Sequence, residues 1–207
     1  GRPQVAYKET ISAAASGVGE YIKHPTGGAG EFAIVTIEVE PGETGSGFAF
    51  ENAVSAGAIP LEFIEAVEQG CRESIDSGHL GGYPVMDVRM RLVTGQAHET
   101  ESSDRAFGIA ASMAANDGLA KASPVLLEPI MKVEVVTPED FRGAVQGDLN
   151  GRRGQIKGIE MRGQYQVVKA DVPLAEMFGY VSSVRSMTQG RASYTMQFAH
   201  YSQVPGT

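Results

Sequence analysis

The sequence predicts an α+β protein with two domains: a sheet that carries two helices over residues 1–122, and a ferredoxin-like βαββαβ domain over residues 123–207. Several short segments alternate apolar and polar residues, as half-buried strands do, while longer segments repeat apolar residues every three to four positions, as helices do. Ser123 and Pro124 then interrupt a helical pattern, since proline disfavours helix in the residue before it. With 207 residues and 42% apolar content, the chain is long enough to bury a core in each domain.

The first domain is expected to open with an antiparallel pair of strands. One strand begins within residues 5–12, and residues 32–40 alternate Ile and Val with Thr and Glu, which gives the sheet one wet face. The connection at residues 23–31 suits a long hairpin tip because its glycines can adopt positive φ angles: Gly27, Gly28 and Gly30. A second glycine-rich turn and a short strand follow at residues 41–47 and 48–51.

Two helices and a further strand complete this domain. The first helix starts at Pro60 and ends at Gly78, with apolar residues at helical spacing: Leu61, Ile64, Val67, Cys71 and Ile75. Residues 85–93 alternate and then turn at Thr94 and Gly95, which predicts a strand with charged Asp87, Arg89 and Arg91 on one face. The second helix starts near Ser102 and Ser103 and ends by Ala122. Its small residues would let it lie close to the sheet: Gly108, Ala111, Ala115 and Gly118.

The second domain shows six segments in the order βαββαβ, which defines the ferredoxin-like arrangement. The expected strands and helices are, in order, residues 127–136, 138–149, 155–161, 165–172, 174–187 and 192–199.

Charge is distributed unevenly between the two parts. Residues 1–123 contain 8 Lys and Arg against 17 Asp and Glu, whereas residues 124–207 contain 9 against 8. RNA binding is usually driven by neutralisation of phosphates, so an RNA contact in the first part has to come from a local tip and not from a basic face.

Composition also restricts the compartment and the chemistry. Cys71 is the only cysteine, so we expect a buried helical thiol in a reducing cytoplasmic compartment. No apolar run approaches the roughly 20 residues that span a bilayer, so a soluble protein without a membrane partner is expected. A start at Gly1 in place of Met suggests a piece of a longer chain. The sequence contains no Gly-Lys pair, hence no phosphate-binding P-loop, and no histidine spacing typical of a metal site.

Several ordered blocks resemble the two C-terminal domains of the elongation factor G family. The longest are residues 123–138 and 173–196, and shorter ones lie at residues 1–10, 57–60, 82–87, 102–107, 147–154 and 188–195. The resemblance implies that the first domain is the family's elongated fourth domain, with a left-handed crossover, and that the second is its fifth. The family continues into a further helix, whereas this sequence stops after Val204-Pro-Gly-Thr.

The resemblance also implies that two tip loops carry the function. The first loop of the family falls on Thr26, Gly27, Gly28, Ala29, Gly30 and Glu31. The second contains Gln96 and His98, and His98 occupies the position that related eukaryotic factors modify. Ala29 lacks a basic side chain that the family often has, and Glu31 puts a carboxylate where the family often has an amide. These two departures are expected to weaken RNA contact.

From the residues alone, His98 with Glu99 or Asp104 could act as a general base, but no nucleophile accompanies it, so a solvated loop histidine is the simpler interpretation. The resemblance favours contact with tRNA or with RNA of the decoding centre. Arg152 and Arg153 are candidate rRNA contacts, or else charges that stabilise the end of a helix. Gly190-Arg191 is a further candidate anchor on rRNA, and the alternative is that Arg191 pairs with a carboxylate within the fold.

The function that the resemblance implies is promotion of tRNA–mRNA translocation on the ribosome by a passive part of a translational GTPase. Its partners would be rRNA, the tRNA–mRNA complex of the decoding region and the GTPase centre of the large subunit, with the factor a monomer. No cofactor is expected in this chain, because GTP and Mg²⁺ would bind a nucleotide domain upstream. The alternatives are a paralogue that acts in ribosome recycling or ribosome protection, and a stand-alone enzyme that uses His98.

Overall fold

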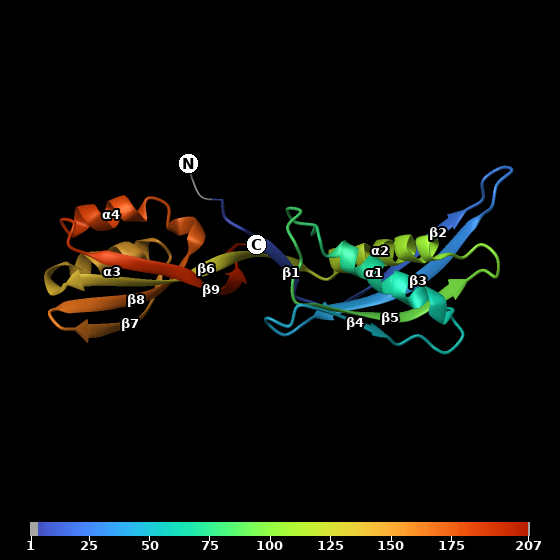
Figure 1. The fold of residues 1–207 in the computed structure, drawn as a ribbon, viewed down its shortest axis with the longest axis horizontal. Helices are drawn as coiled ribbons and strands as arrows, with labels where there is room; N and C mark the ends of the chain where they lie inside the picture. The colour runs from blue at the N-terminus through green and yellow to red at the C-terminus, as the bar shows by residue number, and fades with distance from the viewer. Residues whose placement is uncertain (1–3, 207) are drawn as a thin grey trace. The chain divides into compact units, whose positions relative to one another are not determined.

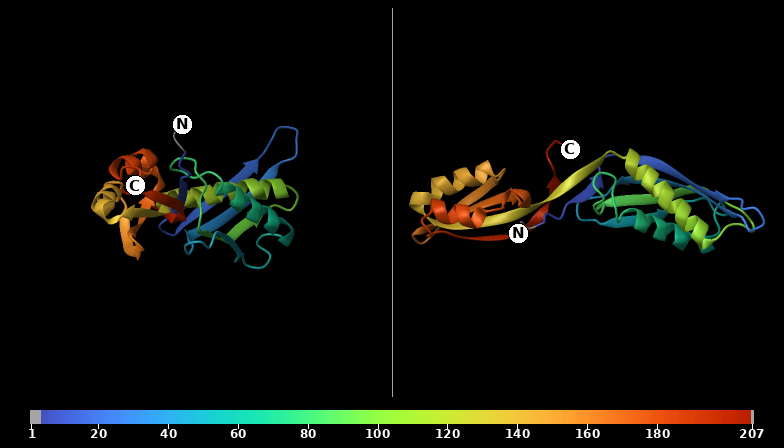
Figure 2. Two further views of the ribbon diagram at one scale, coloured as in Figure 1. Left: turned by 60° about the vertical axis from the view of Figure 1, so that its left-hand side comes forward. Right: turned by 90° about the horizontal axis from the view of Figure 1, so that it is seen from above.

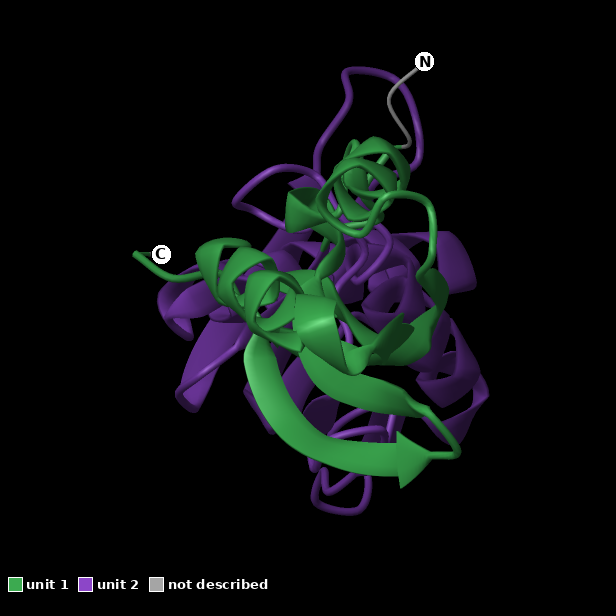
Figure 3. Cartoon of the chain, turned by 90° about the vertical axis from the view of Figure 1, so that its left-hand side faces the viewer, with its two compact units in different colours: residues 1–7, 127–206 green, residues 8–126, 207 purple. Residues whose placement is uncertain are grey.

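The computed structural model describes residues 4–206, which contacts divide into two compact units. Unit 1 contains the residues up to 7 and residues 127–206, and unit 2 contains residues 8–126 (Figure 3). The division falls within strand β6 (Pro124–Pro138), a few residues after the boundary at 122/123 that the sequence suggests. That boundary therefore stays a prediction.

Unit 2 is built on a four-stranded sheet in the order β2-β3-β5-β4 (Figure 1). The strands are β2 (Ala15–Lys23), β3 (Glu31–Pro41), β4 (Phe48–Asn52) and β5 (Val88–Ala97), preceded by the short β1 (Lys8–Ile11). β2 and β5 are antiparallel to β3, whereas β4 is parallel to β5. A parallel neighbour requires a crossover, which here contains α1 (Ile64–Ser74). The hand of this crossover stays a prediction.

Two helices pack on one face of that sheet and bury the core. α1 follows a short 3-10 turn, η1 (Leu61–Phe63), and α2 spans Asp104–Lys121. The alternation expected for residues 32–40 and 85–93 is confirmed, because Val35, Ile37 and Val39 are buried, as are Val88 and Met90. The N-cap expected for α2 is also confirmed: the Ser103 hydroxyl accepts a hydrogen bond from Ala106 N.

The first strand pair differs from the expectation. The partner of β3 is β2, and not residues 5–12. The sequence pattern did not predict β2, because Gly17 and Gly19 have a low propensity for strands. Their function is close packing: a Cβ at Gly17 or Gly19 would overlap a carbonyl oxygen of α2, that of Ala114 or Ala110 respectively. The glycines therefore let the helix backbone lie against the strand.

Three further details of unit 2 also differ. The helix expected from Pro60 to Gly78 is α-helical only from Ile64 to Ser74, and Leu61 is exposed. β5 continues through Gly95 to Ala97 without the expected turn. Asp87 precedes β5 with a φ of 58° and its carboxylate accepts hydrogen bonds from the backbone of the 41–47 turn, so it does not belong to the charged strand face.

Cys71 is fully buried in α1, as expected, and burial raises the pKa of its thiol to about 12, with a smaller contribution from Glu68. This thiol is therefore inert.

Unit 1 has the ferredoxin-like order. After β6 come η2 (Glu139–Phe141), α3 (Arg142–Gly151), β7 (Gln155–Arg162), β8 (Tyr165–Pro173), η3 (Leu174–Glu176), α4 (Tyr180–Met187) and β9 (Ser193–Gln203). Its strands lie in the order β9-β6-β8-β7, with these neighbours antiparallel, and β1 also pairs with β6 in the same sheet. The helix expected at 174–187 is interrupted by Gly179, which has a φ of 75°. Within residues 4–206, no helix is long and apolar enough to cross a membrane.

Candidate functional site at the loop end of unit 2

Two loops lie at the same end of unit 2 (Figures 1 and 2). One is residues 24–30, between β2 and β3, and the other is residues 98–103, between β5 and α2. Hydrogen bonds hold the second loop against the start of β3, directly after the first loop: Phe32 N donates to Glu101 O at 2.9 Å, and the Ser102 hydroxyl donates to Phe32 O at 2.7 Å. The structure thus brings together the two segments that the sequence singled out. We call them together the tip.

The β2–β3 loop is exposed from Thr26 to Ala29. Gly27 has a φ of 75°, a conformation that other residues rarely adopt. Gly30 is half-buried, and a Cβ there would overlap the carboxylate of Glu101 from the other loop. Gly30 therefore lets the two loops approach each other.

The carboxylate of Glu31 is paired within unit 2. It accepts hydrogen bonds from the Arg105 guanidinium at 2.5 Å and from the Tyr21 hydroxyl at 3.0 Å. The hydrogen bond from Arg105 is the main cause that lowers the pKa of the Glu31 carboxyl. Arg105 therefore balances the charge of Glu31 locally, and the weakening of RNA contact that the sequence suggested for Glu31 stays a prediction. Arg105 lies 74 residues away, so no local pattern could reveal this pair.

His98 is exposed, and its ring is held by its own loop. Nδ1 accepts hydrogen bonds from Thr100 N at 3.2 Å and Glu101 N at 3.1 Å. The main-chain N–H of His98 donates to the Ser102 hydroxyl at 2.9 Å, and the Phe32 ring lies 6.0 Å from the imidazole. Gln96, also exposed, precedes the loop on β5.

These contacts do not form a catalytic arrangement. The imidazole nitrogen that could act as a base is occupied by main-chain donors, and the Thr100 hydroxyl is 3.4 Å from it, too far for an activated nucleophile. Between residues 4 and 206, no group of three or more His, Cys, Asp or Glu could hold a metal ion.

Arg152 lies inside unit 1. Its guanidinium donates to Asp148 at 2.9 Å, to the main chain of Glu176 at 2.7 Å and to Ser183 at 2.9 Å, and only 15% of the side chain is exposed. These bonds join the end of α3 to α4 and to the segment before it. The geometry favours the structural alternative for this residue.

Arg153 pairs with two carboxylates. It donates two hydrogen bonds to Glu128, at 2.9 and 3.1 Å, and one to Glu176 at 3.1 Å. The bonds to Glu128 are the main cause that raises the pKa of Arg153. Glu128 is almost fully buried, a feature that the sequence did not reveal. The carboxylate pairing that was one alternative for Arg191 is not observed: its guanidinium lies over the Phe141 ring, and no ion pair among the described residues includes it. Its role as an rRNA anchor stays a prediction.

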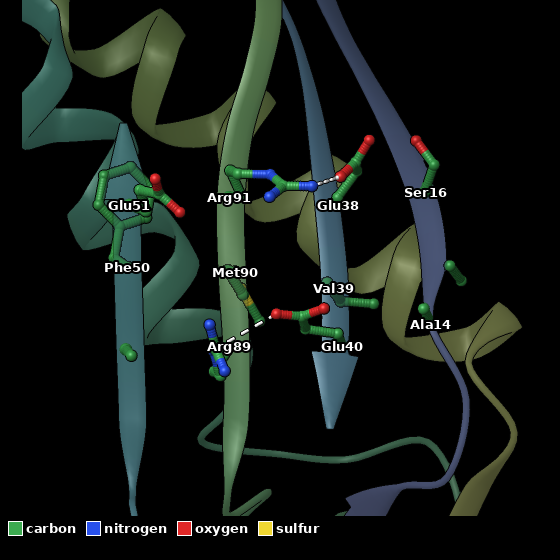
Figure 4. Close-up of a pocket in the computed structure, with 12 residues that line it drawn as sticks. Ala14, Ser16, Glu38, Val39, Glu40, Phe50, Glu51, Arg89, Met90 and Arg91 are labelled. Atoms are coloured by element: carbon green, nitrogen blue, oxygen red, sulfur yellow. Dashed lines mark hydrogen bonds and ion pairs between the residues drawn. The ribbon is translucent and has the colours of Figure 1, made fainter. Parts of the chain in front are cut away.

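Away from the tip, unit 2 has a groove of about 330 Å³ on the open face of its sheet (Figure 4). Charged side chains of β3 and β5 line it in pairs, Arg91 with Glu38 and Arg89 with Glu40. These two pairs balance their own charges, and Glu51 on β4 adds one further carboxylate to the lining, so the groove offers no strong selection for an anion.

Comparison with known families places these features in context. The model of elongation factor G, domain IV, matches residues 3–123, and the model of the elongation factor G C-terminus matches residues 125–207. The chain belongs to the elongation factor G family. It is 56% identical over 205 residues to elongation factor G of Aquifex pyrophilus. That match covers 99% of this chain but only 29% of the relative.

A solved structure agrees with the fold. A crystal structure of a protein from Thermus thermophilus superposes with a TM-score of 0.89 at 42% identity, over 99% of this chain and 30% of that one. The two-domain α+β fold expected of an elongation factor G is therefore confirmed. The chain spans less than a third of the length of each of these relatives.

Proposed function

We propose that this chain is the C-terminal part of an elongation factor G that promotes movement of the tRNA–mRNA complex on the ribosome. The observation that carries the proposal is the 56% identity to an elongation factor G over nearly the whole chain, which includes both tip loops. This identity to a translocation factor argues against a recycling or protection paralogue. The arrangement around His98 argues against a stand-alone enzyme.

The tip is the part that we propose enters the A site of the small subunit. Its contact residues would be Thr26, Gly27, Gly28, Ala29, Gly30, Gln96 and His98, with Glu31 in support through Arg105. Unit 2 is acidic overall, so phosphate neutralisation cannot supply most of its affinity. Shape and hydrogen bonding by the exposed loops then have to do so.

The effect on translocation would be thermodynamic. A bound element shifts the equilibrium between two ribosomal states only by its difference in affinity for them. The tip would therefore bind better when tRNA and mRNA have moved out of the A site, and would oppose their return.

Unit 1 would dock near the GTPase centre of the large subunit. We assign Arg152 and Arg153 a structural function there, in place of direct rRNA contact, because their donors are engaged within the unit. The remainder of the factor would carry the nucleotide domain with GTP and Mg²⁺. Hydrolysis there would drive the displacement of this part. A monomer in the cytoplasm fits such a factor.

The test is single-turnover translocation by the full-length factor that contains this chain. The wild-type factor should move the tRNA–mRNA complex, and His98→Ala should slow that step while ribosome-stimulated GTP hydrolysis is kept. His200→Ala, an exposed histidine of unit 1, is the matched control and should leave both rates unchanged. Subunit splitting without translocation would instead identify a recycling factor.

A further inference from the structure

The ladder of the β2–β3 hairpin ends at the pair Lys23–Glu31, directly before loop 24–30. Two further groups meet the Glu31 carboxylate there. The Tyr21 hydroxyl donates to it at 3.0 Å, and the Arg105 guanidinium donates to it at 2.5 Å. The same guanidinium also donates to the Tyr21 hydroxyl at 3.2 Å. Glu31, Tyr21 and Arg105 thus close a ring of hydrogen bonds at the base of the loop, which we call the Glu31 cluster.

Arg105 belongs to the other half of the tip. It is the second residue of α2, which begins at Asp104, directly after loop 98–103. The start of α2 is itself fixed, because the Ser103 hydroxyl caps it through Ala106 N. The Glu31 cluster therefore joins the base of the first loop to the end of the second through one side chain.

The position of the cluster along α2 explains why this link consists of side chains. Further from the tip, Gly17 and Gly19 let the main chain of β2 lie against α2. Tyr21 is the next residue on that face of the strand, because successive side chains alternate between faces. A tyrosine cannot lie as close to a helix as a glycine, so the direct contact ends here, and the Arg105 guanidinium lies 5.8 Å from the centre of the Tyr21 ring. Hydrogen bonds from Arg105 replace the main-chain contact at the end of the hairpin that carries the loop.

The ion pair in this cluster adds little to folding stability. The side chain of Arg105 is 65% exposed and that of Glu31 is 29% exposed. Pairs exposed to this extent contribute little, because water and salt screen them. The effect of the cluster is therefore local. Two donors from different elements fix the direction of the Glu31 carboxylate, and its neighbours Gly30 and Phe32 also contact the second loop.

We propose that Arg105 is a positioning residue of the tip, which holds the base of loop 24–30 at a fixed spacing from loop 98–103 through Glu31 and Tyr21. The inference rests on the proposed function and adds how the same site is kept ready for binding. Arg105 does not have to touch RNA in this role, because it acts through the loop. A loop that is ordered in advance avoids the loss of affinity that ordering on binding would cause.

Backbone NMR relaxation of this chain measures the effect on the loop. In the wild type, the amides of Gly30 and Glu31 should have order parameters of about 0.85, typical of a rigid main chain. Arg105→Ala should lower them to about 0.6 or less. Tm should stay within about 4 °C of the wild type, because the pair is exposed. Arg91→Ala is the matched control: Arg91 also forms an exposed ion pair with a glutamate of β3, Glu38, away from the tip, and its loss should leave these order parameters unchanged.

Single-turnover translocation by the full-length factor measures the effect on function. Arg105→Ala should slow this step by about 5-fold or more, since a misplaced contact group reduces a rate steeply. Ribosome-stimulated GTP hydrolysis should be kept, and Arg91→Ala should translocate at the wild-type rate. Exchange of the two charges, Glu31→Arg with Arg105→Glu, should bring the rate back to within about 2-fold of the wild type, whereas each single reversal should be slow.

The positioning role has several contrary results. Unchanged order parameters in Arg105→Ala would show that Arg105 does not hold the loop. A normal rate in spite of lowered order parameters would show that the spacing of the loops is not needed. If the exchanged pair failed to restore the rate, Arg105 would act through a contact of its own, such as an RNA phosphate, and the positioning role would be refuted. A wild-type factor that did not translocate would contradict the proposed function, while the order parameters would still test the role of Arg105.

Discussion

Replacing Arg153 by Ala removes the guanidinium that donates two hydrogen bonds to Glu128. The side chain of Glu128 is only 3% exposed, so its carboxylate would stay buried without this partner. Removal of one member of a buried ion pair costs about 3–5 kcal/mol. Because 39% of the Arg153 side chain is exposed, we expect the lower end, about 3 kcal/mol. The φ of 58° at this position is equally unfavourable for Ala, so backbone strain is unchanged.

Thermal unfolding of this chain, followed by circular dichroism and calorimetry, measures the effect. For a domain of the size of unit 1, each 1 kcal/mol lowers Tm by about 4–8 °C, so the transition of unit 1 should fall by about 12–24 °C. The transition of unit 2 should not move. Combining Arg153→Ala with Glu128→Gln should restore a large part of the loss, since burying a neutral amide costs less than burying a carboxylate.

A change in Tm of less than about 2 °C for Arg153→Ala would refute the reasoning. If that variant also weakened ribosome binding by the full-length factor, Arg153 would be an rRNA contact, as the sequence first suggested, and not a structural residue.

Further outcomes follow from the packing and from the tip. Gly17→Ala should destabilise unit 2 by about 2 kcal/mol or more, because the added Cβ overlaps the α2 backbone, as a shift in urea midpoint will show. Tyr180→Phe should be neutral or stabilising by up to about 1 kcal/mol in the same assay on unit 1, since the buried hydroxyl has no hydrogen-bond partner among the described residues. NMR titration should find the pKa of the Glu31 carboxyl below its ordinary value, and Arg105→Ala should raise that pKa. The contribution of this ion pair to folding stability is therefore present at neutral pH and is lost as pH falls through the lowered pKa. Ser102→Ala should slow translocation with little change in Tm, and Ser102→Thr should restore the rate.

Each of these outcomes has a contrary result. Gly143→Ala, where nothing lies near the added Cβ, is the control for Gly17, and equal stability of the two variants would contradict the close packing. A destabilised Tyr180→Phe would reveal a hydrogen bond to that hydroxyl. A Glu31 titration that ignores Arg105 would remove the ion pair from the tip. A normal rate for Ser102→Ala would show that His98 does not need this hydroxyl.

Local patterns predicted the elements in which the residue types alone indicate which positions are buried. Alternation of Val88, Met90 and Leu92 with arginines identified β5, and Ser103 marked the start of α2. β2 was not predicted because its glycines are explained only by their contact with a helix almost 100 residues later in the chain. That contact leaves no pattern in the sequence of the strand itself. The resemblance located both loops.

What the sequence could not supply is pairing across the fold. Glu31 looked like a free charge until Arg105 was placed beside it, and Arg153 looked like a free cation until the buried Glu128 was found. In both cases the partner lies 25 or more residues away. The exposure of a charged residue therefore depended on tertiary structure, and so did the interpretation of its function.

The contact of β2 with α2 has a mechanical consequence. Where glycines let a helix backbone rest on a strand, bending the hairpin would require compressing main chain against main chain, which is much stiffer than side-chain packing. α2 has 18 residues and is therefore about 27 Å long. A force applied at loop 24–30 is carried along that length before it reaches more flexible parts of the chain. The base of the β2–β3 hairpin is therefore rigid, and we expect loop 24–30 to keep its position on the sheet under load.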